Sequence, residues 1–296
     1  MRYSRAEYLG HYIFFLLLRF AGRAPAYLLL ALVIFFYVLF FPGSRKIQPY
    51  LRCRFPGSGP VKRLWYAYRL YYCFGQVAID SVWQSLGPEN TIAGEFADRQ
   101  RLLDLIGEGR GVILLTAHIG NWQTALFNLK DLPVAVYALM DLDQQALIER
   151  FKGLGPGFKI IQPGQEGFGG IIEAMSALAR GEVVTVMGDR ADRGPRTYAE
   201  FLGARIGLPS LPYVLARSSG APVVLLFSHR ISRSRYQVRI WDVLRADQSA
   251  SREECCRQMA QAFARALEEY VEQHPFQWFN FPGLERPIMA KAGQTG

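Results

Sequence analysis

The sequence is poor in cysteine, and its few cysteines have no spacing suited to metal or disulfide chemistry. Four occur in 296 residues, at Cys53, Cys73, Cys255 and Cys256. None forms a C-x-x-C pair and two are adjacent, so neither a zinc centre nor a disulfide framework is indicated. We therefore expect a reducing, cytosolic environment for the folded part of the chain, and no bound metal.

Motifs of several common enzyme classes are also missing. The sequence contains no G-x-S-x-G, no G-x-x-x-x-G-K-[ST] and no H-E-x-x-H, so serine hydrolases, P-loop proteins and zinc proteases lack support. The glycines between residues 164 and 170 do not match the G-x-G-x-x-G of dinucleotide-binding proteins. With 50% hydrophobic and 20% charged residues, the composition excludes a disordered or collagen-like chain.

Acidic residues are scarce at one end of the chain. Residues 1–75 hold one acidic side chain, Glu7, against eleven basic ones, for a net charge of +10. Because the whole chain carries +9, the remainder sums to −1. The basic residues flank residues 26–41, an apolar run without any charge. Basic flanks on an apolar run indicate an anionic phospholipid surface as the partner, and not a nucleic acid.

The apolar run is interpreted as an uncleaved membrane anchor. Residues 40–42, Phe-Phe-Pro, offer no small-residue site for a signal peptidase. The run is slightly short for a spanning helix, although residues 12–18 add an upstream apolar patch. The sequence leaves open whether the helix crosses the bilayer, while basic flanks at both ends favour a helix lying in one leaflet. We expect an anchor with its basic flanks over residues 1–60 and one catalytic domain over residues 61–296.

Strand and helix patterns alternate beyond the anchor. Apolar and aromatic side chains at helical spacing predict a helix over 62–86. Runs rich in β-branched residues predict buried strands at 111–117, 134–139, 159–161, 183–187 and 222–227. Further helices are expected at 96–107, 121–130, 143–152, 167–180, 208–219 and 251–273, and a half-exposed edge strand at 235–243. The pattern predicts an α/β fold, with a mixed central sheet covered by helices on both faces and preceded by the hydrophobic N-terminal helix.

One histidine is distinguished by its position. Of the four histidines, only His118 directly follows a predicted buried strand and precedes a helix start. Ligands of open α/β sheets bind at such places. Gly120 permits a tight turn, Asn121 is a favourable cap residue, and main-chain N–H groups at a helix start can stabilise an anion. A general base beside an anion site is one hypothesis, and an ordinary structural histidine is the alternative.

The residues around His118 resemble a known family. The string at 116–123, Thr-Ala-His-Ile-Gly-Asn-Trp-Gln, is similar to the catalytic block of the bacterial lipid A biosynthesis acyltransferases, part of the wider lysophospholipid acyltransferase group. The resemblance continues in order through 186–190, 201–203, 220–224 and 274–280. Five ordered blocks over nearly the whole chain are much more specific than one short motif.

This resemblance implies an acyltransferase at the inner membrane of a Gram-negative bacterium, with the catalytic domain on the cytoplasmic side. It implies that His118, as general base, takes a proton from a hydroxyl of a membrane lipid acceptor while the oxygen attacks a thioester. Acyl carrier protein or coenzyme A would carry the fatty acyl chain, and no further cofactor is expected. The acceptor is left open among a lipid A precursor, a glycolipid and another specialised lipid.

The chain departs from the family at one position of the reacting dyad. Where the family has Glu or Asp after four spacers, this sequence has Gln123, which lacks the charge that favours an imidazolium. Three interpretations follow. In the first, another carboxylate supplies the charge, from Asp189, Asp192 or Glu200. In the second the dyad works without a charge, and in the third the chain is a catalytically impaired, membrane-anchored lipid-binding relative. The first is preferred, and we assign catalytic roles to His118, Gln123 and Asp189.

Substrate-binding residues are expected near the same blocks. Arginine forks suit phosphate or carboxylate, and Arg190 directly follows a predicted strand. For Arg193, a solvated loop with internal ion pairs is an equal alternative. We assign substrate binding to Asn121, Trp122, Arg190, Arg193 and Glu200.

Overall fold

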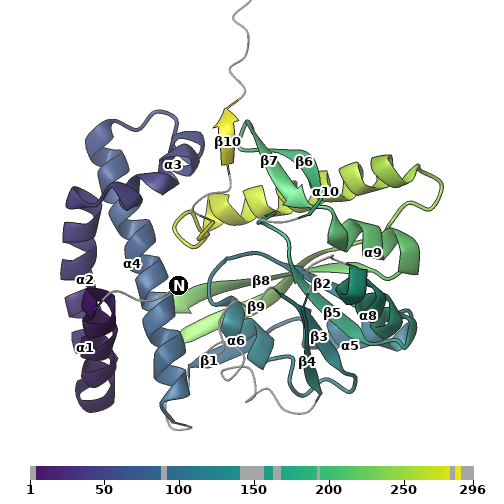
Figure 1. Ribbon diagram of the computed structural model, residues 1–296, viewed down its shortest axis with the longest axis horizontal. Coiled ribbons are helices and arrows are strands. Elements are labelled where there is room, and N and C mark those ends of the chain that lie inside the picture. Colours follow the sequence, from purple (N-terminus) through teal and green to yellow (C-terminus); the bar gives the residue numbers. More distant parts are fainter. Residues whose placement is uncertain are drawn as a thin grey trace, which may run out of the picture.

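The protein joins a layer of N-terminal helices to an α/β domain (Figure 1). The computed structural model describes residues 5–87, 92–140, 157–162, 168–191, 194–280 and 284–287. The helices are α1 (Arg5–Ala21), α2 (Arg23–Phe40), the short 3-10 helix η1 (Pro42–Ile47), α3 (Gln48–Arg54), α4 (Pro60–Ser85), α5 (Arg99–Gly107), α6 (Trp122–Phe127), α8 (Phe168–Ala179), α9 (Leu211–Ser219) and α10 (Arg252–Gln273). The strands are β1 (Ala93–Phe96), β2 (Val112–Thr116), β3 (Val136–Leu139), β4 (Phe158–Ile161), β5 (Val183–Met187), β6 (Arg196–Phe201), β7 (Ala204–Pro209), β8 (Val223–Ser232), β9 (Arg235–Leu244) and β10 (Leu284–Pro287).

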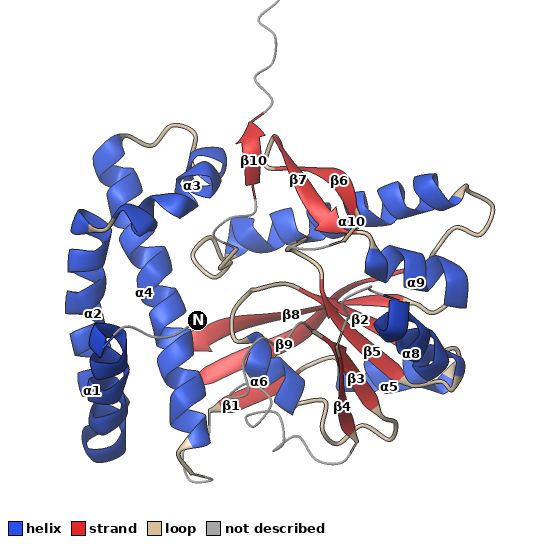
Figure 2. Cartoon of the chain, viewed as in Figure 1, coloured by secondary structure: helices blue, strands red, loops and turns tan. Residues whose placement is uncertain are grey.

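In the described part of the chain, seven strands form the central sheet, in the order β1-β9-β8-β2-β5-β3-β4. Neighbouring strands are parallel throughout, except that β8 and β9 are antiparallel. A second, antiparallel sheet has the order β10-β7-β6, and lies beside α10 (Figure 2). The mixed central sheet confirms the predicted α/β fold class.

Helices cover both faces of the central sheet. Along β2, Ile113 and Leu115 belong to a core cluster that includes side chains of α8, α9 and α10. The alternate residues Val112 and Leu114 belong to a second cluster with side chains of α5 and α6. Because successive side chains of a strand point to opposite faces, a strand buried on both faces is apolar at every position. This explains the continuous apolar run from which the strand was predicted.

The edge-strand prediction for residues 235–243 was wrong. This segment is β9, which lies between β8 and β1 inside the sheet. The edge strand on this side of the sheet, β1, is only four residues long and includes Gly94 and Glu95, so it lacks the β-branched run that predicts a strand. The expected helix at 96–107 therefore begins later, at Arg99. The half-exposed pattern of β9 itself is confirmed.

The hairpin of β6 and β7 was not predicted. Its second strand, β7, ends at Pro209, so α9 begins at Leu211 and not at residue 208 as expected. The helix expected at 143–152 lies outside the described residues. The strands at 111–117, 134–139, 159–161, 183–187 and 222–227 are confirmed by β2, β3, β4, β5 and β8.

The N-terminal helices stand side by side at one end of the central sheet (Figure 1). Within the described residues, α2 is the one helix long and apolar enough to cross a membrane, with a mean hydropathy of 2.1. It packs along α4, and the chain then turns through η1 and α3. The division into an anchor and a catalytic domain at residue 60 stays a prediction.

Candidate active site

His118 lies in the turn between β2 and α6, directly beyond a strand whose five residues are all buried. The turn is tight, because Ile119 donates its main-chain N–H to the carbonyl of Ala117 at an N···O distance of 2.8 Å. Gly120 has a φ of +49°, and a Cβ there would meet the carbonyl oxygen of Ser228 at 2.1 Å. Only glycine fits this position, which fixes the course of the chain after His118.

The sheet register brings Asp189 to the same place. β2 and β5 are parallel neighbours in which Thr116 pairs with Met187, so His118 and Asp189 each lie two residues beyond a strand end. Gly188 donates its N–H to the carbonyl of Thr116 at 2.7 Å. A Cβ at Gly188 would meet a leucine side chain of β2 at 2.6 Å, so glycine permits this close approach of the two chain segments.

His118 and Asp189 form a hydrogen-bonded pair. Nδ1 of His118 lies 2.8 Å from Oδ1 of Asp189, and the main-chain N–H of His118 donates to Oδ2 at 3.1 Å. The Asp189 side chain is fully buried, whereas 24% of the His118 side chain is exposed. The carboxylate thus holds one nitrogen of an imidazole that is still accessible.

The segment after α10 completes the surroundings of Asp189. The buried indole of Trp278 donates Nε1–H to Oδ2 of Asp189 at 3.0 Å, and Asn280 Nδ2 donates to its main-chain oxygen at 2.6 Å. Phe279 donates its N–H to the carbonyl of His118 at 2.7 Å. The sequence assigned no role to Trp278 or Asn280. The one signal that pointed to them was their place in the 274–280 block.

The donors around Asp189 decide its protonation. Burial alone would raise the pKa of Asp189, but the charge and hydrogen bonds of His118, together with the charge of Arg190, hold the pKa below its ordinary value. The ionised carboxylate accepts the Nδ1 proton, which leaves the lone pair of a neutral imidazole on Nε2. Such a pair can orient a general base and stabilise the imidazolium that forms when the base takes a proton.

Comparison with known families supports the resemblance seen in the sequence. The family of bacterial lipid A biosynthesis acyltransferases matches residues 87–282, which is more than half of the chain. This chain belongs to that family. It is therefore an O-acyltransferase of lipid biosynthesis.

The chain was also compared with solved structures and with curated proteins. Among solved structures, this lipid A acyltransferase family member is similar to the 1-acyl-sn-glycerophosphate acyltransferase from Thermotoga maritima. The two are 15% identical, the match covers 86% of this chain and 98% of that chain, and the TM-score is 0.38. A comparison with curated proteins finds no match.

Position 123 of this family member does not hold the imidazole. Gln123 lies in α6, and its Oε1 atom is buried without a hydrogen-bond partner among the described residues. Asp189 occupies the place beside Nδ1 of His118. The structure therefore brings together the pair named in the preferred interpretation, while the catalytic roles of all three residues stay predictions.

The main-chain N–H groups of the turn are already engaged. Those of His118, Ile119 and Gly120 donate to Asp189 Oδ2, to the carbonyl of Ala117 and to that of Gln277. The helix that follows, α6, has only six residues. These three N–H groups therefore already have acceptors, and the anion site expected at the start of α6, from Trp122 onward, stays a prediction.

The two residues after this turn have different surroundings. Asn121 is fully buried, and its Oδ1 accepts a hydrogen bond from Ser81 of α4 at 3.4 Å. Trp122 is partly exposed, and its ring lies 6.4 Å from the His118 ring, edge to face. Asn121 thus ties the turn to α4, whereas Trp122 lies next to the imidazole.

Arg190 contacts the closing segment of the chain. Its Nε donates to Oδ1 of Asn280 at 3.2 Å, and one terminal nitrogen donates to the carbonyl of Phe279 at 2.6 Å. Since Asn280 also donates to the carbonyl of Asp189, Arg190 and Asn280 together hold the segment that carries Trp278. These bonds give Arg190 a structural contact in addition to its predicted role in substrate binding.

The remaining predicted residues are not brought to this pair by any described contact. Glu200 is exposed, and its main chain exchanges two hydrogen bonds with Gln261 of α10, at 2.9 and 3.0 Å. Arg193 and Asp192 lie outside the described residues. Within the described residues, no three His, Cys, Asp or Glu side chains form a group that could hold a metal ion.

Proposed function

We propose that this protein transfers a fatty acyl group from an acyl carrier protein or coenzyme A thioester to a hydroxyl of a membrane lipid. Nε2 of His118 removes the hydroxyl proton as the oxygen attacks the thioester carbonyl. The carbon–sulfur bond breaks, the acyl chain forms an ester with the acceptor, and the imidazolium returns the proton to the departing thiolate. This balance needs no covalent enzyme intermediate and no cofactor.

One observation carries the proposal: a partly exposed imidazole whose Nδ1 lies 2.8 Å from a fully buried carboxylate. A buried carboxylate that stays ionised favours the imidazolium, and this is the form produced as the alcohol loses its proton. Asp189 then orients His118, which is the task that the family gives to the acid four spacers after the histidine.

The surface charge and the apolar helix support the proposed partners. Exposed basic side chains of the N-terminal segment include Arg45, Lys46 and Lys62. Such charges attract both anionic phospholipid and the acidic acyl carrier protein. The apolar helix α2 supports attachment to a membrane. We assign the protein to the bacterial inner membrane, with the catalytic domain on the cytoplasmic side where the thioester donor is presented.

Acyl transfer by the detergent-purified chain tests the reaction. A labelled acyl thioester is incubated with candidate acceptor lipids, and the ester product is measured by mass spectrometry. His118→Ala should lower kcat by about 10²- to 10⁴-fold, the usual contribution of a general base. Asp104→Asn is the control, because this carboxylate lies on the exposed side of α5.

Two results would contradict the proposal. Equal kcat values for His118→Ala and the unaltered chain would remove His118 as the base. Tight binding of lipid and thioester by the unaltered chain with no ester product would favour the impaired lipid-binding relative.

The dependence of KM on salt tests whether the basic N-terminal segment attracts acyl carrier protein. If the basic N-terminal segment attracts acyl carrier protein, raising the ionic strength should increase the KM for the carrier-bound donor more than the KM for a short acyl thioester, because salt screens long-range attraction. Equal effects on the two KM values would exclude this electrostatic contribution.

A further inference from the structure

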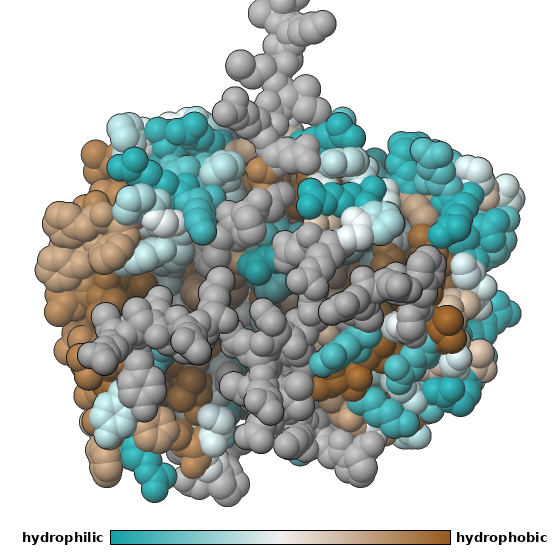
Figure 3. Space-filling model, viewed as in Figure 1, coloured by the Kyte–Doolittle hydropathy of each residue, from teal (hydrophilic) through white to brown (hydrophobic). Residues whose placement is uncertain are grey.

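The N-terminal helices carry most of the exposed apolar surface of the molecule. In the described part of the chain, twenty large hydrophobic side chains are exposed, and all but Ile172, Tyr198 and Ile231 lie in residues 9–74. Phe20 and Leu28 are 81% and 76% exposed. Figure 3 shows the corresponding hydrophobic area on the side of the molecule formed by α1 and α2. A contiguous apolar patch of this kind marks an interaction surface.

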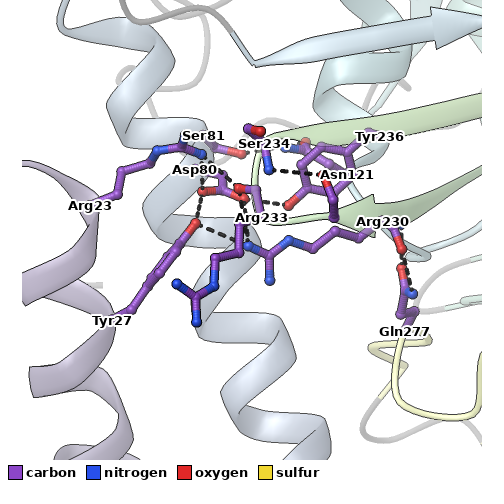
Figure 4. A network of polar contacts seen from close by, with 11 residues as sticks. Arg23, Tyr27, Asp80, Ser81, Asn121, Arg230, Arg233, Ser234, Tyr236 and Gln277 are labelled. Carbon is purple, nitrogen blue, oxygen red and sulfur yellow. Dashed lines mark hydrogen bonds and ion pairs between the residues drawn. The ribbon is translucent and has the colours of Figure 1, made fainter.

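The N-terminal end of α2 is bonded to the α/β domain. Arg23 donates to the carbonyl of Arg233 in the β8–β9 turn at 2.8 Å and pairs with Asp80 of α4 at 3.3 Å. The hydroxyl of Tyr27 donates to one oxygen of the same carboxylate, and that of Tyr236 donates to the other at 2.6 Å. Asp80 is fully buried between these groups (Figure 4). The beginning of α2 is thereby held against the end of the central sheet.

The C-terminal end of α2 is also held in place, by α4 and by the segment that follows α2. The ring of Tyr37 packs edge to face on that of Tyr71 of α4 at 5.1 Å. In α3, which follows η1, Tyr50 donates its hydroxyl to the carbonyl of Pro275 at 2.7 Å. The Tyr50 ring also lies 5.1 Å from the indole of Trp278, the residue that donates to Asp189. The C-terminal end of α2 is thus joined to the α/β domain through α4, η1 and α3, and Val38 near this end belongs to the core cluster that includes side chains of the central sheet.

These contacts are incompatible with a helix that crosses a bilayer. The 18 residues of α2 measure about 27 Å, close to the roughly 30 Å of a hydrocarbon core. A spanning helix of this length has its two ends in opposite aqueous phases, and a single folded domain cannot contact both. A second arrangement would insert α1 and α2 into the bilayer as a hairpin with its tip at Gly22. It is excluded too, because Arg23 next to that tip is bonded to Asp80 and to the carbonyl of Arg233 in the folded domain.

We propose that α2 lies in the plane of the membrane, with the exposed apolar faces of α1, α2 and the start of α4 buried in one leaflet of an anionic phospholipid bilayer. Charge supports this occupant, since the exposed Arg45, Lys46 and Lys62 lie beside the apolar surface in η1 and at the start of α4. On α4, Trp65 is 56% exposed, and tryptophan is typical of the membrane interface. The inference rests on the proposed membrane attachment and specifies its geometry.

This placement brings the catalytic turn close to the membrane. The ring of Phe74 in α4 lies 5.2 Å from that of Phe279, whose N–H donates to the carbonyl of His118. Asn121 of the same turn accepts from Ser81 of α4. Helix α4, which packs behind α2, therefore also contacts the turn that carries His118.

Sided labelling of single cysteines tests the geometry. In a full-length chain whose four native cysteines are replaced, one cysteine is introduced at a time by Arg19→Cys, Arg45→Cys or Ser249→Cys, all at exposed positions. The first two flank α2 and the third lies on the α/β domain. Each variant is expressed in cells, and sealed membrane vesicles of known sidedness are treated with a membrane-impermeant thiol reagent.

All three cysteines should react from the same side and to a similar extent. Protection of Arg19→Cys or Arg45→Cys under conditions in which Ser249→Cys reacts would show that α2 crosses the bilayer and would overturn the inference. Recovery of the chain in the soluble fraction would overturn it as well. The melting temperature of each purified variant establishes that it is folded.

Depth measurements give a second readout. Leu28→Cys, Leu32→Cys and Phe40→Cys, each labelled with an environment-sensitive fluorophore, are bound to phosphatidylethanolamine–phosphatidylglycerol vesicles that carry quenchers at defined depths. An in-plane helix predicts nearly equal depths, whereas a spanning helix predicts that Leu32→Cys lies about 12 Å deeper than Phe40→Cys. Neither experiment depends on turnover, so a catalytically inactive chain with this topology would contradict the proposed reaction and leave the in-plane helix supported.

Discussion

Asp80 and Asp189 are both buried carboxylates, but they face different cations. Asp80 on α4 is 0% exposed, and Asp189 after β5 is 1% exposed. Asp80 lies 3.3 Å from a guanidinium nitrogen of Arg23 and 3.7 Å from one of Arg230. Asp189 lies 2.8 Å from the imidazole of His118.

The difference teaches how the same side chain serves two tasks. A guanidinium stays charged at any ordinary pH, so the cations that face Asp80 do not exchange protons. Burial and the charge of Asp80 raise the pKa of Tyr236, whose hydroxyl therefore remains a donor to that carboxylate. An imidazole, by contrast, can take up and release a proton during a reaction. Asp80 thus connects α2, α4 and the β8–β9 hairpin through hydrogen bonds and ion pairs. Asp189, by contrast, is paired with a group that can transfer a proton.

Among changes to the residues around His118, the largest expected effect on activity comes from Asp189→Asn. An amide can keep the shape of the site but removes the charge that stabilises the imidazolium, so kcat should fall about 10³-fold, below the roughly 10⁴-fold of the analogous change in a serine protease. Thermal unfolding should change by only a few degrees. Steady-state kinetics and a melting curve on the same preparation measure both, and a kcat within about tenfold of the unaltered enzyme would remove Asp189 from the mechanism.

Asp80→Asn should lower the stability of the fold strongly and change kcat little, the reverse of Asp189→Asn. It leaves Arg23 and Arg230 without their counter-charge, so the free energy of unfolding should fall by about 3–5 kcal/mol. The kcat per folded molecule should stay within about threefold. Denaturant unfolding and kinetics are compared with Asp104→Asn, in which the altered carboxylate is exposed. A loss of kcat as large as that of Asp189→Asn would erase the proposed contrast between the two acids.

Trp278→Phe should have an intermediate effect on activity. It keeps the aromatic packing against Tyr50 and Phe201 but deletes the N–H that donates to Asp189 at 3.0 Å. A hydrogen bond to a charged group contributes about 1.5–3 kcal/mol, so a tenfold loss of kcat, about 1.4 kcal/mol, is expected. Trp241→Phe is the matched control, because its indole donates to an exposed glutamate. Equal kcat values for the two variants would contradict the role of the indole.

His229 offers a contrast to His118, because its neighbour is a second imidazole. Burial, followed by the charges of His274 and Arg239, lowers the pKa of His229 to about 4. The unfolded chain therefore binds more protons below its ordinary pKa of about 6.5, and stability is lost as the pH falls from there towards 4.

For a half-buried ring screened by solvent, this loss should amount to about 1 kcal/mol. His229→Phe should flatten the dependence of the unfolding free energy on pH in this window. Asp189, with its lowered pKa, affects stability only at still lower pH: its contribution is present above the unfolded pKa of about 3.9 and is lost below it. An unchanged slope in denaturant unfolding from pH 7 to 4.5 would contradict the assignment to His229.

The smallest effect is expected from Gln123→Glu. It restores the residue type of the family dyad, but Nδ1 of His118 is already held by Asp189. The kcat should stay within about threefold of that of the unaltered enzyme. A gain of tenfold or more would show that position 123 can serve as the dyad acid in this chain.

The sequence located most elements because their signals are local. Continuous apolar runs predicted β2, β3, β4, β5 and β8, since a strand buried on both faces has no polar positions. The same reasoning missed β1, whose four residues include a glycine and a glutamate. It also placed β9 at the edge, because alternating polarity reports exposure of one face and does not report the neighbours of a strand.

The candidate site was predicted in part for the same reason. His118 was found from its place after a buried strand, and Asp189 was one of three carboxylates weighed for the missing charge. The register Thr116↔Met187 brings Asp189 beside His118, and a register of parallel strands is not visible in either strand alone. Trp278 and Asn280 come from the other end of the chain, and nothing local marks them as donors to Asp189.

The sequence by itself determined the apolar N-terminal helix, the alternation of strands and helices, and the histidine after the first buried strand, because hydrophobic periodicity and residue type act over a few neighbouring residues. Only the tertiary structure decided that Asp189 lies against His118, that β9 is internal and that both ends of α2 are joined to one domain. These depend on strand order, strand register and packing between residues far apart in the chain, which no short segment encodes alone.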